Sequence, residues 1–308
     1  MLRTILVPLD GSPLAEQALG TATLLARETG AVLDIVTVIE PLLAEGLDEA
    51  TIGTDELRVR EEYARETVEE VASGASVQAT GTVLRGRPAE QIGEREKAIG
   101  ADLIVMTSHA RTGLKRVILG SVADAVVRNV GAPVLLLRPE ETTLHPSELR
   151  RSFSNVLIPL DGSESSASIL PGAMEVARAV NARVTVLQVV MPVPLAVPYD
   201  AIMPLVYAPV VPDREATDKV MAESGESLAG VAARLRSESG LVVESQVVEA
   251  AGIGEGIADY AKAHDMDLIA MSTRTRGASR FFLGSVADRV LRSTDLPMLL
   301  HRPPTSEA

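Results

Sequence analysis

Short apolar runs rich in Val, Ile and Leu alternate along the chain with longer stretches in which apolar residues recur at helical spacing. This alternation is typical of a parallel sheet whose strands are joined by crossover helices. The pattern predicts ten strands, five in each half of the chain. They cover residues 4–8, 32–39, 76–84, 103–107 and 133–137 in the first half and residues 155–159, 183–190, 241–248, 268–272 and 297–301 in the second.

Helix boundaries are marked at the ends of the first strands. Ser12 and Ser163 each follow a first strand, where a serine hydroxyl can cap the helix that comes next. Gly30 stands where the helix that begins after Ser12 should end, and glycine is the usual residue at that position.

Two motifs occur twice in the same order, which indicates a tandem duplication. Ile5-Leu-Val-Pro-Leu-Asp-Gly-Ser12 returns as Leu157-Ile-Pro-Leu-Asp-Gly-Ser163, with the aspartates 151 positions apart. Leu119-Gly-Ser-Val-Ala-Asp124 returns as Leu283-Gly-Ser-Val-Ala-Asp288, 164 positions away. The extra length of the second copy falls mainly in a proline-rich stretch, residues 191–213.

The length of 308 residues suits two domains of about 150 residues, each with its own core. We expect copy one to cover residues 1–139 and copy two to cover residues 153–304. The linker between them, residues 140–152, is polar and contains Pro146.

Composition narrows the class of protein. Hydrophobic residues make up 46% of the chain, yet only four Tyr and three Phe are aromatic, so the core is mainly aliphatic, as in buried parallel strands. No apolar run reaches the roughly 20 residues of a membrane helix, and Met1 leads directly into a strand without a secretory pattern. We therefore expect a cytoplasmic protein that does not insert into membranes.

Charge and residue usage exclude several chemistries. The absence of cysteine rules out disulfides, thiolate nucleophiles and cysteine zinc sites, and the four histidines are too scattered for a histidine metal centre. A net charge of −13 repels nucleic acid unless a basic patch is segregated, and the sequence shows no such patch. We expect no nucleic-acid partner.

The repeated Asp-Gly-Ser motif ends the first strand of each copy. Ligands of open parallel sheets bind at the carboxyl ends of the strands, where Asp10 and Asp161 can accept hydrogen bonds from a ligand or help to hold a hydrated cation. The alternative is an ordinary strand-to-helix turn with a cap. Recurrence of the motif favours the ligand role.

The repeated Gly-Ser-Val motif begins a helix in each copy, at Gly120-Ser121-Val122 and Gly284-Ser285-Val286. Glycine lets a ligand approach the backbone, and free N–H groups with the helix dipole attract phosphate. The loops before these helices carry basic residues that could wrap a polyphosphate or, alternatively, form solvated surface: Arg111, Lys115, Arg116, Arg274, Arg276 and Arg280.

Other candidate motifs carry less. Gly252-Ile-Gly-Glu-Gly256 lacks the third glycine of a dinucleotide fingerprint and does not follow a first strand. His109 could be a proton carrier or a phosphate contact, yet copy two has Thr273 or Arg274 at that place. No phosphate-binding Gly-x4-Gly-Lys-Ser/Thr motif or recurring Ser-His-Asp set is present, so a hydrolase has little support.

In combination these residues resemble the universal stress protein family over essentially the whole chain. The matching segments are Val7-Pro-Leu-Asp-Gly-Ser12, Val38 near the end of the second strand, Gly86-Arg-Pro-Ala89, Asp102-Leu-Ile-Val-Met106 and Leu119-Gly-Ser-Val-Ala123. The resemblance implies an α/β fold of two tandem flavodoxin-like (Rossmann-like) domains. Each would be a five-stranded parallel sheet of order 3-2-1-4-5 with helices on both faces.

ATP-binding members of the family resemble Gly-x2-Gly-x9-Gly-Ser/Thr, and this chain departs from that pattern. Copy one has Thr107 and Ala110 at the first two glycine positions, although alanine adds only a methyl group. Copy two has Met271 and Arg274 there when counted back from Gly284, and its loop is one residue shorter when the fourth strands are aligned. Arg274 could replace backbone donors with a charged fork.

The resemblance implies that Asp10, Val38, Asp161 and Val189 line the adenine and ribose end of two nucleotide sites and that the Gly-Ser-Val triplets hold the phosphates. The nucleotide is expected to be ATP with Mg²⁺. The nucleotide-binding residues are then Pro8, Leu9, Asp10, Val38, Met106, Thr107, His109, Ala110, Gly120, Ser121 and Val122 in copy one, and Pro159, Leu160, Asp161, Val189, Met271, Ser272, Arg274, Gly284, Ser285 and Val286 in copy two.

Three functions remain open. The first is a stress-response protein in which ATP biases a conformation or a contact with a protein partner. The second is a slow ATPase or phosphotransferase that uses Asp10 to organise Mg²⁺, although no positioned base or arginine finger is evident. The third is an interaction scaffold that has lost nucleotide binding, which the missing glycines permit.

Two structural expectations concern contacts beyond a single copy. Residues 191–213 contain six prolines and several apolar residues that would otherwise be exposed, which predicts an ordered flap or interaction surface. The alternative is a flexible loop. The last strands, Pro133 to Leu137 and Pro297 to His301, would each leave an unpaired edge, so we expect them to pair antiparallel. The chain would then be an intramolecular pseudo-dimer, open to further homodimerisation.

Overall fold

The computed structural model describes residues 1–40, 49–75, 77–108, 119–139, 151–195, 212–273 and 284–303. The described side chains of the helix at 49–75 begin at residue 57 and end at residue 74. The expected linker between the copies, apart from its last residues, and most of the expected proline-rich flap lie outside these ranges.

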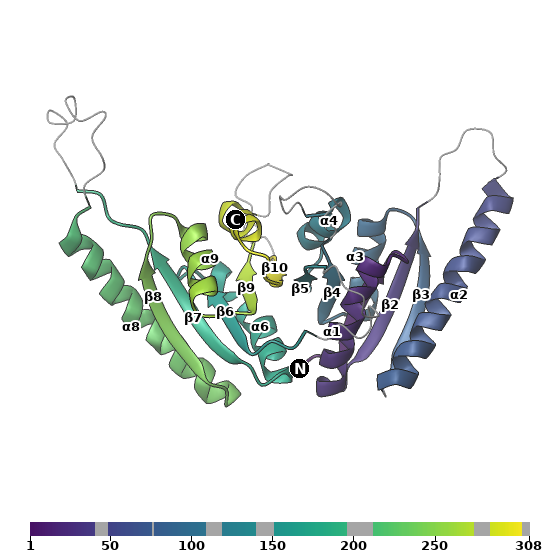
Figure 1. The fold of residues 1–308 in the computed structure, drawn as a ribbon, viewed down its shortest axis with the longest axis horizontal. Helices are drawn as coiled ribbons and strands as arrows, with labels where there is room; N and C mark the ends of the chain where they lie inside the picture. The colour runs from purple at the N-terminus through teal and green to yellow at the C-terminus, as the bar shows by residue number, and fades with distance from the viewer. Residues whose placement is uncertain are drawn as a thin grey trace, which may run out of the picture.

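Copy one contains five strands joined by helices, as the apolar pattern predicts (Figure 1). Its strands alternate with its helices in the order β1 (Thr4–Leu9), α1 (Pro13–Thr29), β2 (Val32–Ile39), α2 (Glu49–Ala75), β3 (Ala79–Arg85), α3 (Pro88–Ile99), β4 (Leu103–Thr107), α4 (Ser121–Asn129) and β5 (Val134–Leu137).

Copy two repeats the same succession with one broken helix. Its elements are β6 (Asn155–Pro159), α5 (Glu164–Ala167), α6 (Leu170–Ala179), β7 (Arg183–Val190), α8 (Arg214–Ser239), β8 (Val243–Glu249), α9 (Ile253–Ala263), β9 (Leu268–Ser272), α10 (Ser285–Ser293) and β10 (Met298–His301). The counterpart of α1 is divided into α5 and α6, because Pro171 has no N–H with which to continue the first helix.

The expected helix caps are confirmed. The Ser12 hydroxyl accepts a hydrogen bond of 3.2 Å from the Ala15 N–H, and the Ser163 hydroxyl accepts one of 3.1 Å from the Ser166 N–H. Gly30 ends α1 in the left-handed conformation, with φ of 74°.

Most strand boundaries match the expected ranges, and the third strand of each copy differs the most. β3 and β8 begin at Ala79 and Val243, a few residues later than the pattern predicts. The residues immediately before them still contribute to the ladder, because Gln78 and Val242 each accept one backbone hydrogen bond from the neighbouring strand. The apolar run therefore continues past the point where regular pairing stops.

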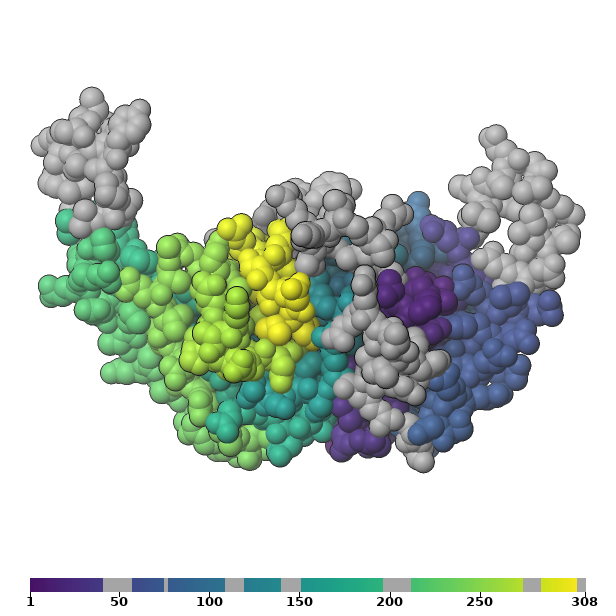
Figure 2. Space-filling model, in the orientation of Figure 1, coloured from purple at the N-terminus to yellow at the C-terminus, as the bar shows by residue number. Residues whose placement is uncertain are grey.

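All ten strands form one sheet of order β3-β2-β1-β4-β5-β10-β9-β6-β7-β8. Each copy therefore has the expected order 3-2-1-4-5, with parallel pairing throughout. The two halves meet where β5 pairs antiparallel with β10, with Leu136 opposite Met298 and Leu135 opposite Leu299. The expected pairing of the two edges is confirmed within one chain, and Figure 2 shows the copies joined along the middle of the molecule.

Helices cover both faces of this sheet and enclose two core layers. One layer joins the sheet to α1, α2, α6 and α8, and the other joins it to α3, α4, α9 and α10. Both layers continue across the centre: Leu135 and Leu299 belong to the first, and Leu136 and Met298 to the second. The copies therefore share their hydrophobic core.

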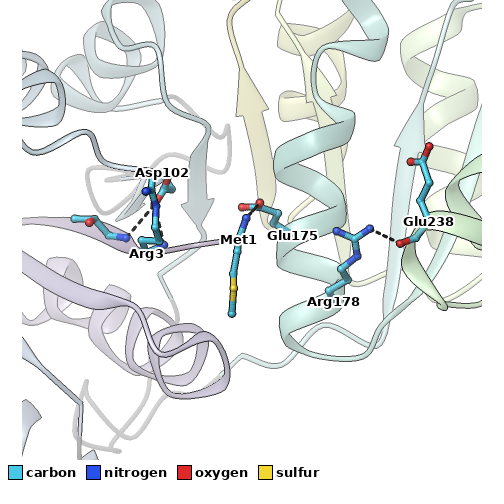
Figure 3. Close-up of polar contacts among 7 residues, drawn as sticks. Met1, Arg3, Asp102, Glu175, Arg178 and Glu238 are labelled. Atoms are coloured by element: carbon cyan, nitrogen blue, oxygen red, sulfur yellow. Dashed lines mark hydrogen bonds and ion pairs between the residues drawn. The ribbon is translucent and has the colours of Figure 1, made fainter.

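A carboxylate at the amino edge of the sheet fixes the first strand of each copy. Asp102 accepts hydrogen bonds from the backbone N–H groups of Arg3 (2.8 Å) and Thr4 (3.0 Å), and Figure 3 shows these contacts. Asp267 does the same in copy two for Ser154 (2.7 Å) and Asn155 (3.0 Å). The Asp-Leu-Ile motif is therefore a structural clamp that recurs in both copies.

Contacts near this edge also link helices and copies (Figure 3). The Met1 ammonium group pairs with Glu175 of α6, which brings the start of copy one against copy two. Arg178, one turn further along α6, donates a hydrogen bond of 3.0 Å to the Glu238 carbonyl in the last turn of α8.

Candidate functional site

In copy one the motif residues gather at the carboxyl edge of the sheet. Because β1 lies between β2 and β4, Asp10 after β1, Val38 in β2 and Met106 at the end of β4 come from adjacent strands. Asp10 is exposed, Val38 is half-buried and Met106 is buried. A carboxylate thus projects above an apolar floor, which suits a ligand with an apolar ring and polar substituents.

Asp10 is held by its own turn and by an arginine from a distant helix. Its Oδ1 accepts a hydrogen bond of 2.9 Å from the Ser12 N–H, and its carbonyl accepts one of 2.7 Å from Nη1 of Arg60 in α2. Gly11, between Asp10 and Ser12 in the chain, has φ of 80°. A Cβ on Gly11 would lie 2.7 Å from Nη1 of Arg60. Glycine therefore provides both the left-handed turn and the space for the arginine.

Arg60 is positioned by Tyr63, its neighbour one turn further along α2. The Tyr63 hydroxyl donates a hydrogen bond of 2.8 Å to Glu16 of α1, which fixes α2 beside the start of α1. Burial, together with the Glu16 carboxylate, raises the pKa of Tyr63, so the phenol stays protonated and continues to donate. Sequence reasoning missed Arg60, because 50 residues separate it from Asp10 and no motif contains it.

The α4 helix supplies the expected anion position. Gly120 is its N-cap, and among the described residues no side chain caps this end. Ser121 and Val122, the first two helical residues, are exposed, so their N–H groups are open to a ligand.

Thr107 adds a buried hydroxyl at the end of β4. Its side chain is 2% exposed, and its Oγ1 has no hydrogen-bond partner among the described residues; the same is true of Thr37 in β2. Both strands flank β1, so the two hydroxyls lie on either side of Leu9. Buried hydroxyls of this kind are usually satisfied by a partner.

In copy two Asp161 occupies the place of Asp10, with a different surrounding. It accepts a hydrogen bond of 3.0 Å from the Ser163 N–H, and Gly162 has a similar φ of 79°. No heavy atom lies within 4 Å of a Cβ built on Gly162, so no described residue fills the place that Arg60 takes in copy one. Pro159, Leu160 and Met271 are buried, and Val189 is half-buried.

The hydroxyl at the end of β9 belongs to an internal polar network. Ser272 lies 2.9 Å from the Ser168 hydroxyl, which in turn lies 3.1 Å from Nδ1 of His301 in β10. Burial lowers the pKa of His301, and a hydrogen bond to the Gly131 backbone of copy one opposes that shift. Sequence reasoning missed this network, because Ser168 is more than 100 positions away from both Ser272 and His301.

The helix that follows in copy two begins with a backbone conformation that favours glycine. Gly284 has φ of 100°, whereas Gly120 has φ of −60°. The exposed Ser285 and the half-buried Val286 then start α10 as expected. His109, Ala110, Arg274 and the other basic loop residues lie outside the described residues.

The glycine run in α9 is explained by packing. A Cβ on Gly256 would lie 2.7 Å from the Ala250 side chain and 2.8 Å from the Val189 side chain, and one on Gly254 would meet Arg289. These glycines let α9 approach its neighbours closely, so the run has a structural role.

The described part of the chain offers little for other kinds of site. No group of three or more His, Asp or Glu residues there could hold a metal ion. None of the described helices is long and apolar enough to cross a membrane.

Comparison with known proteins identifies the family of the chain. The model of the universal stress protein family matches residues 1–138 and again residues 152–302. The chain belongs to the universal stress protein family. Two successive matches of this kind are what a tandem duplication of one universal stress protein domain produces.

Single-domain relatives match about half of the chain. A universal stress protein of Methanocaldococcus jannaschii is 33% identical over 143 residues, which is 45% of this chain and 83% of the relative. The universal stress protein YxiE of Bacillus subtilis is 34% identical over 148 residues, 45% of this chain and 100% of its own length.

A solved universal stress protein of Archaeoglobus fulgidus matches the whole arrangement. It superimposes with a TM-score of 0.69 at 19% identity and covers 97% of this chain and 98% of its own. At that identity the similarity establishes the fold alone.

Proposed function

We propose that this universal stress protein binds ATP at the carboxyl edge of copy one and that bound nucleotide changes its conformation or its contact with a protein partner in the cytoplasm. The observation that carries the proposal is the assembly of Asp10, Val38 and the open start of α4 at one edge of the sheet. A nucleotide needs the same three elements: a polar partner for its base and sugar, an apolar surface, and an anion site.

Each part of ATP then has a partner in copy one. Asp10 and Val38 take the adenine and ribose end, and the backbone N–H groups of Ser121 and Val122 take phosphate oxygens at the positive end of the helix dipole. Mg²⁺ would accompany the phosphates and keep much of its water shell. The Thr107 hydroxyl, which has no hydrogen-bond partner among the described residues, supports the proposal, because a polar ligand at this edge would give it one.

We propose that copy two binds nucleotide more weakly. Its Ser272 hydroxyl is already engaged with Ser168, and Met271 stands where ATP-binding members of the family have glycine. In the family's glycine pattern Arg274 takes the second glycine position and brings a positive charge to it, so copy two is also expected to select a different number of phosphates.

Titration calorimetry of the full chain with Mg-ATP tests the proposal. Ser121→Asp and Ser285→Asp place a carboxylate at the first position of α4 or α10, where the helix dipole tolerates it but a phosphate is repelled. We expect Ser121→Asp to weaken binding at least about tenfold, or about 1.4 kcal/mol, and Ser285→Asp to have the smaller effect. Ser227→Asp, on the exposed face of α8, is the matched control.

The alternatives give different results in the same assay. A chain that binds no ATP, AMP or cyclic nucleotide would be an interaction scaffold. Binding that Ser121→Asp leaves unchanged would put the site elsewhere. Steady-state release of phosphate would show turnover, which a protein that only binds nucleotide does not produce.

A further inference from the structure

Two arginines follow the paired central strands, and each reaches into the other copy. Arg138, directly after β5, donates a hydrogen bond of 2.8 Å from Nη2 to the Leu291 carbonyl of α10. Arg302, directly after β10, donates from Nη1 to the Arg128 carbonyl of α4. Arg138 and Arg302 are 164 positions apart, the same spacing that separates Gly120 from Gly284, so the exchange follows the duplication.

Both arginines bind the last turn of a helix. Leu291 and Arg128 are among the last four residues of α10 and α4, whose carbonyl groups have no partner within the helix. A cation at this end also opposes the negative pole of the helix dipole. Arg138 of copy one therefore caps α10, which begins at the candidate phosphate position of copy two. Arg302 of copy two caps α4, which begins at the candidate phosphate position of copy one.

These helices are short enough to act as rigid connections. α4 and α10 have nine residues each, which corresponds to about 14 Å between a candidate phosphate at one end and the arginine at the other. The two helices also interact electrostatically. Burial raises the pKa of Asp124 in α4, and Arg128 opposes that shift. The Asp288 carboxylate of α10 raises the pKa of Asp124 further.

Arg138 makes a second contact that reaches the copy-one site directly. Its Nη1 donates a hydrogen bond of 3.3 Å to the hydroxyl of Ser108, which follows Thr107 at the end of β4. The Ser108 N–H in turn donates to the Leu137 carbonyl at 2.9 Å. One guanidinium group thus touches the strand end of site one and the helix of site two.

The Arg138 side chain is fixed in this position by its surroundings. Burial lowers its pKa to about 10, so it keeps its charge at neutral pH, and nearby Asp295 favours the charged form. The Arg138 carbonyl accepts a hydrogen bond of 2.8 Å from Arg151. A buried arginine loses much more by releasing its acceptors than an exposed one does, because water does not replace them fully.

We propose that Arg138 and Arg302 are positioning residues that couple the two nucleotide sites, so that ATP bound in copy one stabilises α10 and tightens binding in copy two. This inference rests on the proposed ATP site of copy one. Nucleotide at site one fixes the end of β4 and Ser108, which holds Arg138 on the Leu291 carbonyl and keeps α10 formed up to its start. Coupling is reciprocal, so ligand in copy two favours site one by the same factor.

Hydrogen exchange of a chain with a single open site tests the coupling. In the Ser285→Asp protein the start of α10 carries a negative charge that repels phosphate, so protection that ATP gives to α10 must originate in copy one. We expect saturating Mg-ATP to slow exchange in the last turn of α10 by about fivefold or more, the lower end of typical coupling. Exchange in α9 of the same copy serves as the internal reference for global stabilisation.

Adding Arg138→Met to this protein should abolish the ATP-dependent protection of α10 while ATP still binds to copy one by calorimetry. Arg138→Lys keeps the charge but lacks the planar fork that reaches Ser108 and Leu291 together, so a folded chain with reduced transmission is expected even where the methionine variant fails to fold. Arg27→Met is the matched control, since Arg27 is exposed and pairs with its neighbour Glu28. It should leave the protection intact.

The outcomes separate the two proposals. ATP bound to the Ser285→Asp protein without extra protection of α10 overturns the coupling and leaves the copy-one site standing. Protection that persists equally in both Arg138 variants, or that appears equally in α9, also overturns it. Absence of any ATP binding by this protein overturns the copy-one site and the coupling together.

Discussion

The two copies have the same strand order, but the hydroxyl side chains at the ends of their fourth strands have different hydrogen-bond partners. In copy one Thr107 is buried, and its hydroxyl has no partner among the described residues. In copy two the Ser272 hydroxyl contacts Ser168, which contacts His301 on the neighbouring strand. Copy one therefore leaves this hydroxyl without a partner among the described residues, whereas copy two engages it within the protein.

Arg60 is a second difference between the two copies. Arg60 brings a positive charge to the Asp10 turn, and a Cβ on the equivalent Gly162 in copy two meets no heavy atom within 4 Å. Duplication has thus preserved strand order, caps and clamps while the groups that would face a ligand have diverged. The comparison teaches that shared framework and shared function are separate properties of the two copies.

The largest expected effect tests how far the framework is shared. Leu135 is fully buried opposite Leu299 in the core layer that crosses the centre, so Leu135→Ala should cost about 2 to 5 kcal/mol of unfolding free energy. Leu299→Ala should cost a similar amount, because the two residues fill the same layer. Denaturant unfolding followed by hydrogen exchange in both copies measures this.

Both copies should lose protection together in either leucine variant, since they share one core. Val242→Ala, at an exposed position of copy two, is the control and should have little effect. Loss of protection in copy one alone for Leu135→Ala, or in copy two alone for Leu299→Ala, would contradict a shared core.

The next effect concerns the clamp that both copies retain. Asp102→Ala and Asp267→Ala each remove two hydrogen bonds from backbone N–H groups to a carboxylate, so each should destabilise the chain by about 1.5 to 3 kcal/mol. Chemical denaturation gives both values. A cost confined to one of the two variants would show that the clamps are not equivalent and would extend the divergence into the framework.

Much of the framework could be predicted from the sequence, because it depends on regular patterns. Apolar runs placed all ten strand centres within two residues, and the unpaired last strands indicated the antiparallel junction. The third strands began late since apolar character there extends beyond regular pairing. Helix capping depends on residues that are close in sequence, so the capping roles of Ser12, Gly30 and Ser163 could also be predicted.

The candidate site was predictable only where it follows a motif. Asp10, Val38 and Gly120 lie at one edge because parallel strands carry them there. Arg60 and His301 reach their places through tertiary packing over long sequence separations, and no local pattern encodes such contacts. The glycine run at 252–256 shows the converse, because a motif-like sequence served close helix packing instead.

A smaller effect should distinguish Gly120 and Gly284, the N-cap glycines of α4 and α10. Gly284 has φ of 100°, so Gly284→Ala should cost about 1 to 2 kcal/mol in backbone strain. Gly120 has φ of −60°, which alanine adopts freely, so Gly120→Ala should change the unfolding free energy by less than about 0.5 kcal/mol. Urea denaturation of the two single variants is the measurement, and equal costs would remove this difference between the copies.

The smallest effect is a pH dependence that only copy two should contribute. Burial lowers the pKa of His301 below the ordinary value of 6.5, so between the lowered value and 6.5 the unfolded chain binds more protons than the folded chain. The unfolding free energy must therefore fall as pH falls below 6.5, with a slope from this residue of at most about 1.4 kcal/mol per pH unit.

His301→Leu, which installs the leucine that copy one has at the end of β5, should remove that part of the slope. His264→Gln is the control, because it removes an exposed histidine at the end of α9. Denaturation curves between pH 5 and pH 8 compare the three proteins, and an identical slope for His301→Leu and the parent would show that the copy-two network does not hold a neutral histidine.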